Sequence, residues 1–191
     1  MATASGDGIT VTANVSALLG RSLTFTGITA PTSAGQTIDV QRLDSQGSWV
    51  TVATGTIAVD GTFSVVWQTN YAGHVTTRTV LAQTASASEA GPVPPTLPIT
   101  VYRPSLATYY GKGFFGQRTA CGTLLRRSTL GVASRTMKCG ARVQIYYRGR
   151  SIVVPVIDRG PYANNANWDL TQATAHVLGM LGTATVGTMP V

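Results

Sequence analysis

The stretch LGVASRTMKCGARVQIYYRGRSIVVPVIDRGPY, residues 130–162, decides how the second half of this 191-residue chain is interpreted. It contains two runs rich in β-branched and aromatic residues, each next to a glycine, which is typical of short strands joined by tight turns. The same pattern outside the stretch extends the set of predicted strands to Ala107–Gly111, Ala141–Gly149, Ser151–Asp158 and Thr183–Val191. The second half is therefore predicted to be a small, mostly β barrel.

One segment of this half has a helical pattern, LTQATAHVLGM, residues 170–180. Thr171 can accept a backbone hydrogen bond as N-cap, and Gly179 can end the helix. An apolar face is predicted from Leu170, Ala173, Val177 and Leu178. The barrel is therefore expected to carry one short helix.

The first hundred residues show a different pattern, in which short strand-like runs alternate with turn signals such as TSAGQ and DSQGS. Seven antiparallel strands are predicted, at 8–16, 22–29, 36–44, 48–57, 61–69, 74–83 and 97–104. Seven short strands in this length favour an immunoglobulin-like or fibronectin-like β-sandwich. The segment Ala85–Pro98, rich in proline and small residues, is predicted to form a long loop.

Charge divides the chain at the same place. Residues 1–102 carry three Arg against five acidic residues, a net charge of −2, whereas residues 103–191 carry eleven Lys or Arg against two Asp, a net of +9. We therefore predict two domains, a sandwich over 1–102 and a barrel over 103–191, and an anionic partner for the second.

The two cysteines, Cys121 and Cys139, both lie in the basic half. An even count in a small module favours a disulfide and an oxidising compartment, and two buried thiols are the alternative. Neither cysteine belongs to a CxxC motif, and both histidines are distant in sequence, so we expect no zinc and no other metal or cofactor.

No apolar run is long enough to span a membrane. The start MATASGDG lacks a basic region followed by an apolar core, so we expect either a mature secreted form or a cytosolic start. The cysteines favour the secreted form. A monomer is the expected oligomeric state.

Two aspartates, Asp158 and Asp169, are the only acidic residues of the basic half. Glycosidic bond cleavage needs a carboxylic acid to protonate the leaving oxygen, so an acid–base scheme within this half must use one or both. The alternative is structural: Asp158 ends a strand, and Asp169 can accept N–H bonds just before the helix. The adjacent Arg159 favours this second interpretation, because a nearby arginine lowers the pKa of a carboxyl group.

The motifs ATYYGKGFFGQRTACG, LGVASRTMKCGARVQIYYRGRSIVVPVIDRGPY and DLTQATAHVLGM occur in one order between Ala107 and Met180. Together they resemble the double-psi β-barrel domain of the bacterial rare lipoprotein A family, which is related to the expansin barrel. The resemblance implies an all-β fold: a six-stranded double-psi barrel with one short helix, behind the predicted sandwich. It also implies a disulfide between Cys121 and Cys139, as in a subset of secreted members.

The resemblance further implies a function at the bacterial cell wall, in which a shallow groove binds peptidoglycan or another wall polysaccharide. Such barrels either cleave glycan strands as lytic transglycosylases or loosen wall polymers without cleavage. Asp169 corresponds to the general acid of related enzymes and Asp158 to its partner, with Thr119 and Arg159 beside the same groove. Ser134 stands where catalytic members commonly have a histidine and is predicted to bind substrate at the same groove. Thr123 and Arg126 stand where acids are common, which, together with Ser134, favours the non-catalytic alternative.

Tyr162 and Trp168 lie between the two aspartates, in a segment too polar for a core. Both are predicted to be platforms for sugar stacking. The basic charge would also suit nucleic acid, but the arginines are scattered over loops and no nucleic-acid-binding motif occurs, so nucleic acid is not the expected partner. A surface or virion attachment protein is a third alternative.

Overall fold

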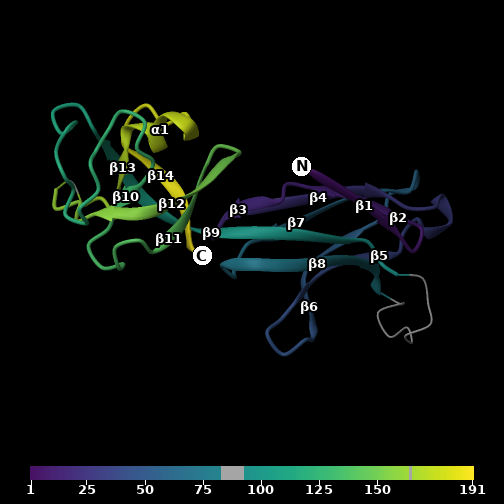
Figure 1. The fold of residues 1–191 in the computed structure, drawn as a ribbon. Coiled ribbons are helices and arrows are strands. Elements are labelled where there is room, and N and C mark those ends of the chain that lie inside the picture. The colour runs from purple at the N-terminus through teal and green to yellow at the C-terminus, as the bar shows by residue number, and fades with distance from the viewer. Residues whose placement is uncertain (83–92, 164) are drawn as a thin grey trace. The chain divides into compact units, whose positions relative to one another are not determined.

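The computed structural model describes residues 1–82, 93–163 and 165–191. Its contacts divide the chain into two compact units, Met1–Val101 and Tyr102–Val191, which we call the N-terminal unit and the barrel unit (Figure 1). The long strand β9 (Thr96–Tyr110) contributes residues to both.

The N-terminal unit consists of two mainly antiparallel sheets. One has the order β1-β2-β4-β7, and in the other β8 lies between β5 and the first part of β9, with β6 at the far edge and β3 also paired to β9. The strands are β1 (Ala2–Gly6), β2 (Ile9–Ala13), β3 (Ser16–Leu18), β4 (Ser22–Ile28), β5 (Thr37–Leu43), β6 (Trp49–Thr56), β7 (Thr62–Gln68) and β8 (Gly73–Leu81), with a 3₁₀ turn, η1 (Pro31–Ser33).

Alternating apolar residues build the core of this unit. In β7, Phe63, Val65 and Trp67 are buried while the residues between them are exposed, as the two-residue period of a strand requires. These side chains belong to one buried cluster with residues such as Phe25 and Ile38.

Two predictions for this unit need correction. Strand β1 was not predicted because its sequence, ATASG, has little strand character; it pairs with β2 through a tight turn in which Asp7 and Gly8 both have positive φ. The predicted loop 85–98 is too long at its end, since β9 begins at Thr96. Pro98 lies within β9, opposite Thr76 of β8. Residues 85–92 of that loop lie outside the described residues.

The barrel unit is a closed six-stranded barrel, as the sequence predicted. The strands are the second part of β9, β10 (Val132–Ala133), β11 (Arg142–Tyr147), β12 (Arg150–Asp158), β13 (Trp168–Thr171) and β14 (Ala184–Pro190). Their order is β13-β10-β12-β11-β14-β9, and parallel pairing of β9 with β13 closes the ring. Fully buried aliphatic residues such as Val143, Ile145 and Val156 fill its interior.

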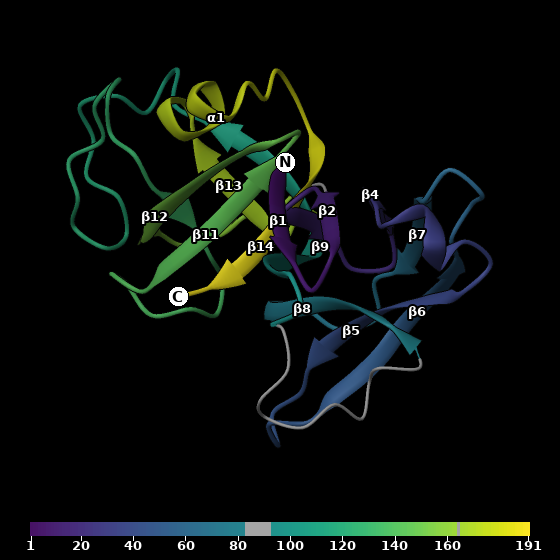
Figure 2. The same ribbon diagram turned by 90° about the vertical axis from the view of Figure 1, so that its right-hand side faces the viewer.

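The helix α1 (Gln172–Leu178) lies at one end of the barrel, in contact with β12 and β13 (Figures 1 and 2). Its predicted ends are confirmed: Thr171 accepts a hydrogen bond from the Thr174 N–H, and Gly179 has φ 72°. The predicted apolar face is wrong in part. The buried helix residues are Thr174, Ala175 and Leu178, whereas Val177 is exposed.

Thr174 is buried because its hydroxyl binds Gly131, accepting from the N–H and donating to the carbonyl, both at 3.0 Å. A side chain at Gly131 would collide with Ile157, since a Cβ there would lie 2.6 Å from that residue. This close approach fixes the start of β10, the short strand on which the candidate site is built.

Candidate active site

The two aspartates lie on either side of one residue, Ala133. In β10, Ala133 pairs with Asp158 of β12 in parallel and with Asp169 of β13 in antiparallel register. Neighbouring strands are separated by about 4.8 Å, so the Cα atoms of the two aspartates are about 10 Å apart. The barrel topology thus brings together two carboxylates that are eleven positions apart in sequence.

Asp158 is held by backbone donors. Its Oδ1 accepts hydrogen bonds from the N–H of Ala120 at 2.9 Å and of Arg159 at 2.8 Å, and its carbonyl accepts one from the Ser134 N–H at 3.1 Å. These backbone donors fix the position of the Asp158 carboxyl group on the groove.

Asp169 has a different environment. Its only side-chain hydrogen bond to a described residue comes from the hydroxyl of Thr108, which donates to Oδ1 at 2.7 Å from the adjacent strand β9. Burial raises the pKa of Asp169, and the nearby charge of Asp158 raises it further, while the bond from Thr108 acts in the opposite direction. The net shift is upward, as a proton donor near neutral pH requires.

Tyr110 lies beside both carboxylates. Burial raises the pKa of its phenol, and so do the charges of Asp158 and Asp169 together with an interaction with the Asp158 side chain. Its hydroxyl oxygen is nevertheless buried without a hydrogen bond of ordinary length and angle to any described residue. Its ring stands edge-on to Phe114, with centroids 6.2 Å apart.

These residues line a groove of about 390 Å³. Its walls come from the end of β9, the loop 111–131, β10 and the segment that follows β12. The lining residues that carry functional groups are Thr108, Tyr110, Phe114, Gln117, Arg118, Thr119, Asp158, Arg159, Tyr162 and Asp169. The aspartates, Thr119, Arg159 and Tyr162, all predicted from the sequence, thus lie on one groove.

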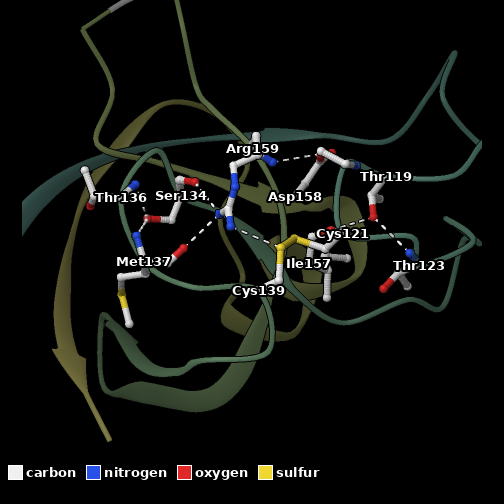
Figure 3. The surroundings of a disulfide bond; sticks show 11 residues. Thr119, Cys121, Thr123, Ser134, Thr136, Met137, Cys139, Ile157, Asp158 and Arg159 are labelled. Atoms are coloured by element: carbon white, nitrogen blue, oxygen red, sulfur yellow. Dashed lines mark hydrogen bonds between the residues drawn. A yellow bond between two sulfur atoms is a disulfide. The ribbon is translucent and has the colours of Figure 1, made fainter.

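Arg159 does not pair with either carboxylate through its guanidinium group. Its Nη1 donates to the carbonyls of Ser134 at 3.0 Å and Met137 at 2.8 Å, and Nη2 lies 3.1 Å from the sulfur of Cys139 (Figure 3). Figure 3 shows this group directed at the 134–139 turn and the disulfide. No arginine is among the causes of the shift at Asp169, so the expected lowering of its pKa by Arg159 does not occur.

The disulfide between Cys121 and Cys139 is present, with Cα atoms 5.7 Å apart. It joins the loop 111–131 to the 134–140 turn. Because Ala120, which binds Asp158, precedes Cys121 directly, the disulfide also fixes one donor of the site.

The hydroxyl of Thr119 links the loop 111–131 to the end of β12. The hydroxyl donates to the Ile157 carbonyl and accepts from the Thr123 N–H at 3.2 Å. Tyr162 is 81% exposed on the groove, in a segment that Arg135 secures by donating to the carbonyls of Pro161 at 2.6 Å and Ala166 at 3.0 Å. An aromatic ring in this position is open to a ligand.

Ser134 and Trp168, both predicted to bind substrate, do not line the groove. Ser134 is buried, and its hydroxyl accepts hydrogen bonds from the N–H groups of Thr136 and Met137. Trp168 is half-buried and packs against the barrel core. Both side chains therefore make contacts within the protein and do not face the groove.

Five of the named groove residues were not predicted as site residues: Thr108, Tyr110, Phe114, Gln117 and Arg118. A partial signal was present, because Thr108 and Tyr110 alternate along the motif ATYYG and must point to the same side of a strand. Their proximity to the aspartates, however, depends on parallel pairing of β9 with β13. Among the described residues, no group of three or more His, Cys, Asp or Glu could hold a metal ion, and no helix is long and apolar enough to cross a membrane.

Comparison with known proteins relates the barrel unit to a family. Residues 105–191 match the family model described as "Lytic transglycolase". The barrel unit is an RlpA-like double-psi β-barrel domain. The match covers the RlpA-like barrel only, including both aspartates and both cysteines, and residues 1–104 lie outside it.

Individual relatives agree with this assignment. A Synechocystis protein named "Probable endolytic peptidoglycan transglycosylase RlpA" is 38% identical over 77 residues, which are 39% of this chain and 24% of that protein. "Endolytic peptidoglycan transglycosylase RlpA" of Campylobacter jejuni is 32% identical over 88 residues, 45% of this chain and 31% of that protein. The chain thus spans about a quarter to a third of these relatives.

Among solved structures, the Streptomyces papain inhibitor is similar to 44% of this chain and 91% of its own, with 31% identity and a TM-score of 0.36.

Proposed function

We propose that the RlpA-like barrel binds glycan strands of peptidoglycan in its groove and cleaves them as a lytic transglycosylase, in the cell envelope or outside the cell. One observation carries this proposal: Asp169 faces the groove with a raised pKa, next to a carboxylate held by backbone donors. The disulfide supports an oxidising compartment.

The reaction needs one acid–base group. Asp169 donates its proton to the glycosidic oxygen as the bond from that oxygen to the anomeric carbon of muramic acid breaks. The 6-hydroxyl of the same muramic acid attacks the anomeric carbon, and the Asp169 carboxylate takes the hydroxyl proton. The products are a 1,6-anhydro end and a free 4-hydroxyl, the proton is returned, and no water is consumed.

Asp158 supports this step through its charge. This charge favours the protonated form of Asp169 and stabilises positive charge that develops at the anomeric carbon. Tyr162 and Phe114, both exposed on the groove, provide ring faces on which sugars stack.

A second candidate is a binding or wall-loosening module that does not cleave, like expansins. It is favoured by the absence of histidine from the residues that line the groove and by the buried position of Ser134. For the N-terminal unit, we propose an immunoglobulin-like sandwich over about residues 1–102 that acts as a spacer or adhesion module.

One experiment separates the two candidates. The protein is incubated with purified sacculi, and the soluble products are analysed by mass spectrometry. The proposal predicts muropeptides ending in 1,6-anhydro-muramic acid, and none with Asp169→Asn. Binding to sacculi without such products would overturn the enzymatic proposal and favour the second candidate.

A further inference from the structure

We infer that a second hollow of the barrel unit binds an acidic segment of a partner protein that also carries apolar side chains. The hollow has a volume of about 580 Å³ and lies between the helix α1 and the loop 111–131. It shares no lining residue with the groove. A partner can therefore bind here whether or not the groove cleaves glycans.

One wall of the hollow is the outer side of α1. Gln172, Ala173, His176 and Val177 all line it, and they form two pairs of residues four positions apart, so they belong to one side of the helix. The opposite side of the helix is buried against the barrel. Figures 1 and 2 both show α1 at the periphery of the barrel unit, where its outer side has no neighbouring element.

The second wall is the end of the loop 111–131 together with Tyr109 of β9. Gly111, where this loop begins, brings the two walls into contact. A Cβ at Gly111 would lie 2.9 Å from the Cβ of Gln172 and 3.0 Å from the ring of Phe115. Close packing at this point fixes the loop against the start of the helix, so the hollow is a built part of the fold.

The hollow gathers exposed apolar side chains. Among the described residues of the barrel unit, eight large apolar side chains are exposed, and four of them line this hollow: Tyr109, Leu130, Val177 and Leu181. Leu181 is 92% exposed. An apolar patch of this kind on a protein surface marks a site of contact with another molecule.

The charged groups of the hollow are all basic. Arg127 and His176 line it, and no acidic residue is among its described lining residues. The Arg127 guanidinium lies over the Phe115 ring, 5.4 Å from the centroid, and in the described chain it makes no hydrogen bond. Its N–H groups can therefore bind a carboxylate of the partner, while apolar side chains of the same partner contact Leu130 and Val177.

Other classes of ligand fit this hollow less well. A membrane surface is too flat to enter a concave site. A nucleic acid needs several cations along its phosphates, and the described lining contains a single arginine. A sugar stacks on aromatic faces, and Tyr109 is the one aromatic residue in that lining. Aliphatic side chains next to a carboxylate match both the apolar walls and the charge.

Titration with three peptides tests this chemistry. The isotopically labelled full chain is observed by NMR with helical peptides that carry leucine at every third or fourth position and glutamate elsewhere, leucine with lysine, or serine with glutamate. The leucine–glutamate peptide should shift the resonances of residues 127–130 and 172–181 and leave those of the groove residues Asp158 and Tyr162 unchanged. At about 100 mM salt, where charges still interact over about 10 Å, the other two peptides should bind at least about tenfold more weakly.

Matched variants within one loop test the location. Arg127→Gln and Leu130→Ala should each weaken binding of the leucine–glutamate peptide about three- to tenfold. The controls are Arg126→Gln and Leu124→Ala, which should leave binding unchanged because neither residue lines the hollow. Leu124 and Leu130 are similarly exposed, at 38% and 41%, so the two alanine variants should remain folded alike, and urea denaturation checks this.

A third pair of variants tests the helix wall without changing the loop. Val177→Glu places a carboxylate beside the carboxylates of the peptide, whereas Val177→Gln has nearly the same shape without the charge. Binding should be about tenfold weaker for the glutamate variant than for the glutamine variant, because like charges repel at short distance.

Several results would overturn the inference. Absence of binding of the leucine–glutamate peptide at about 1 mM would contradict it directly. Equal binding of the lysine or the serine peptide would show that the hollow does not select acidic or apolar character, respectively. Sedimentation of the protein with phosphatidylglycerol vesicles, abolished by Val177→Glu, would assign the surface to a membrane. Dimerisation of the protein in sedimentation velocity, lost in Leu130→Ala, would assign it to a second copy of this chain.

Discussion

Asp158 and Asp169 both pair with Ala133, yet their surroundings differ. The Asp158 side chain accepts hydrogen bonds from two backbone N–H groups, those of Ala120 and Arg159. Among the described residues, the Asp169 side chain accepts one hydrogen bond, from the hydroxyl of Thr108, and burial raises its pKa. The difference teaches that one short strand can place two carboxylates on one groove with different partners. One is held by two backbone N–H donors, and the other has a pKa raised by burial.

The largest effect is expected from exchanging each aspartate for asparagine. Asp169→Asn should reduce cleavage of sacculi about 100-fold or more, because it removes the acid. Asp158→Asn should reduce it less and should move the loss of activity at high pH to lower pH, because the charge that raises the pKa of Asp169 is gone. The release of 1,6-anhydro products as a function of pH measures both. A larger loss for Asp158→Asn would reverse the assigned roles.

The raised pKa of Asp169 also predicts how stability depends on pH. A carboxyl group with a higher pKa in the folded than in the unfolded state favours folding while it is protonated, and this contribution is lost as the pH rises through the folded pKa. Asp169→Asn should therefore make the protein more stable than wild type at pH 7, and this gain should diminish at low pH. Urea denaturation at pH 4 and pH 7 would reveal it, and a loss of stability at pH 7 would contradict it.

Removal of the disulfide should weaken the contacts that hold Asp158 in place. Cys121→Ser with Cys139→Ser is expected to lower the free energy of unfolding by about 3 kcal/mol, through closure of a loop with a sequence separation of 18. The loop that carries Ala120 would become less ordered, so cleavage should fall as well. Denaturation with and without reductant measures the first effect, and an unchanged midpoint would show that the bond adds nothing.

The sequence predicted most of this architecture but not all of the site. The caps of α1 could be predicted because Thr171 and Gly179 act locally. Val177 was wrongly assigned to the apolar face because the helix is only seven residues long, and its buried side is decided by the bond from Thr174 to Gly131. Long-range contacts of this kind cannot be derived from a local pattern.

The same reason explains which site residues could be predicted from the sequence and which could not. Asp158 and Asp169 could be selected because they are the only acids of their half. Thr108 was missed because its role depends on the register of β9 against β13, sixty-one positions along the chain. Trp168 was predicted from the polarity of its segment, but it lies in β13 and packs against the core instead.

A smaller effect is expected from removing the hydrogen bond that Thr108 donates to Asp169. Thr108→Val removes the hydrogen bond that lowers the pKa of Asp169, so this pKa should rise and activity should persist to higher pH. Loss of the bond should also cost about 1 kcal/mol of stability. The pH profile of cleavage is the measurement, with Thr108→Ser as control because it keeps the hydroxyl. A downward shift of the profile would contradict the account.

The smallest change in stability is expected at Tyr110. Its hydroxyl is buried without an ordinary hydrogen bond to the described residues, so Tyr110→Phe should change the free energy of unfolding by less than about 1 kcal/mol. A loss of several kcal/mol in thermal or urea denaturation would show that the hydroxyl has a strong partner in solution.

The central claim is that burial, helped by the nearby charge of Asp158, raises the pKa of Asp169 above its ordinary value. It is tested most directly by carbon-detected NMR titration of the Asp169 carboxyl group in the wild type and in Asp158→Asn. In the wild type, the pKa of Asp169 should lie above the ordinary value for aspartate. In the variant it should be lower but still raised, because burial is the larger cause. A wild-type pKa at or below the ordinary value would contradict the assignment of Asp169 as the acid.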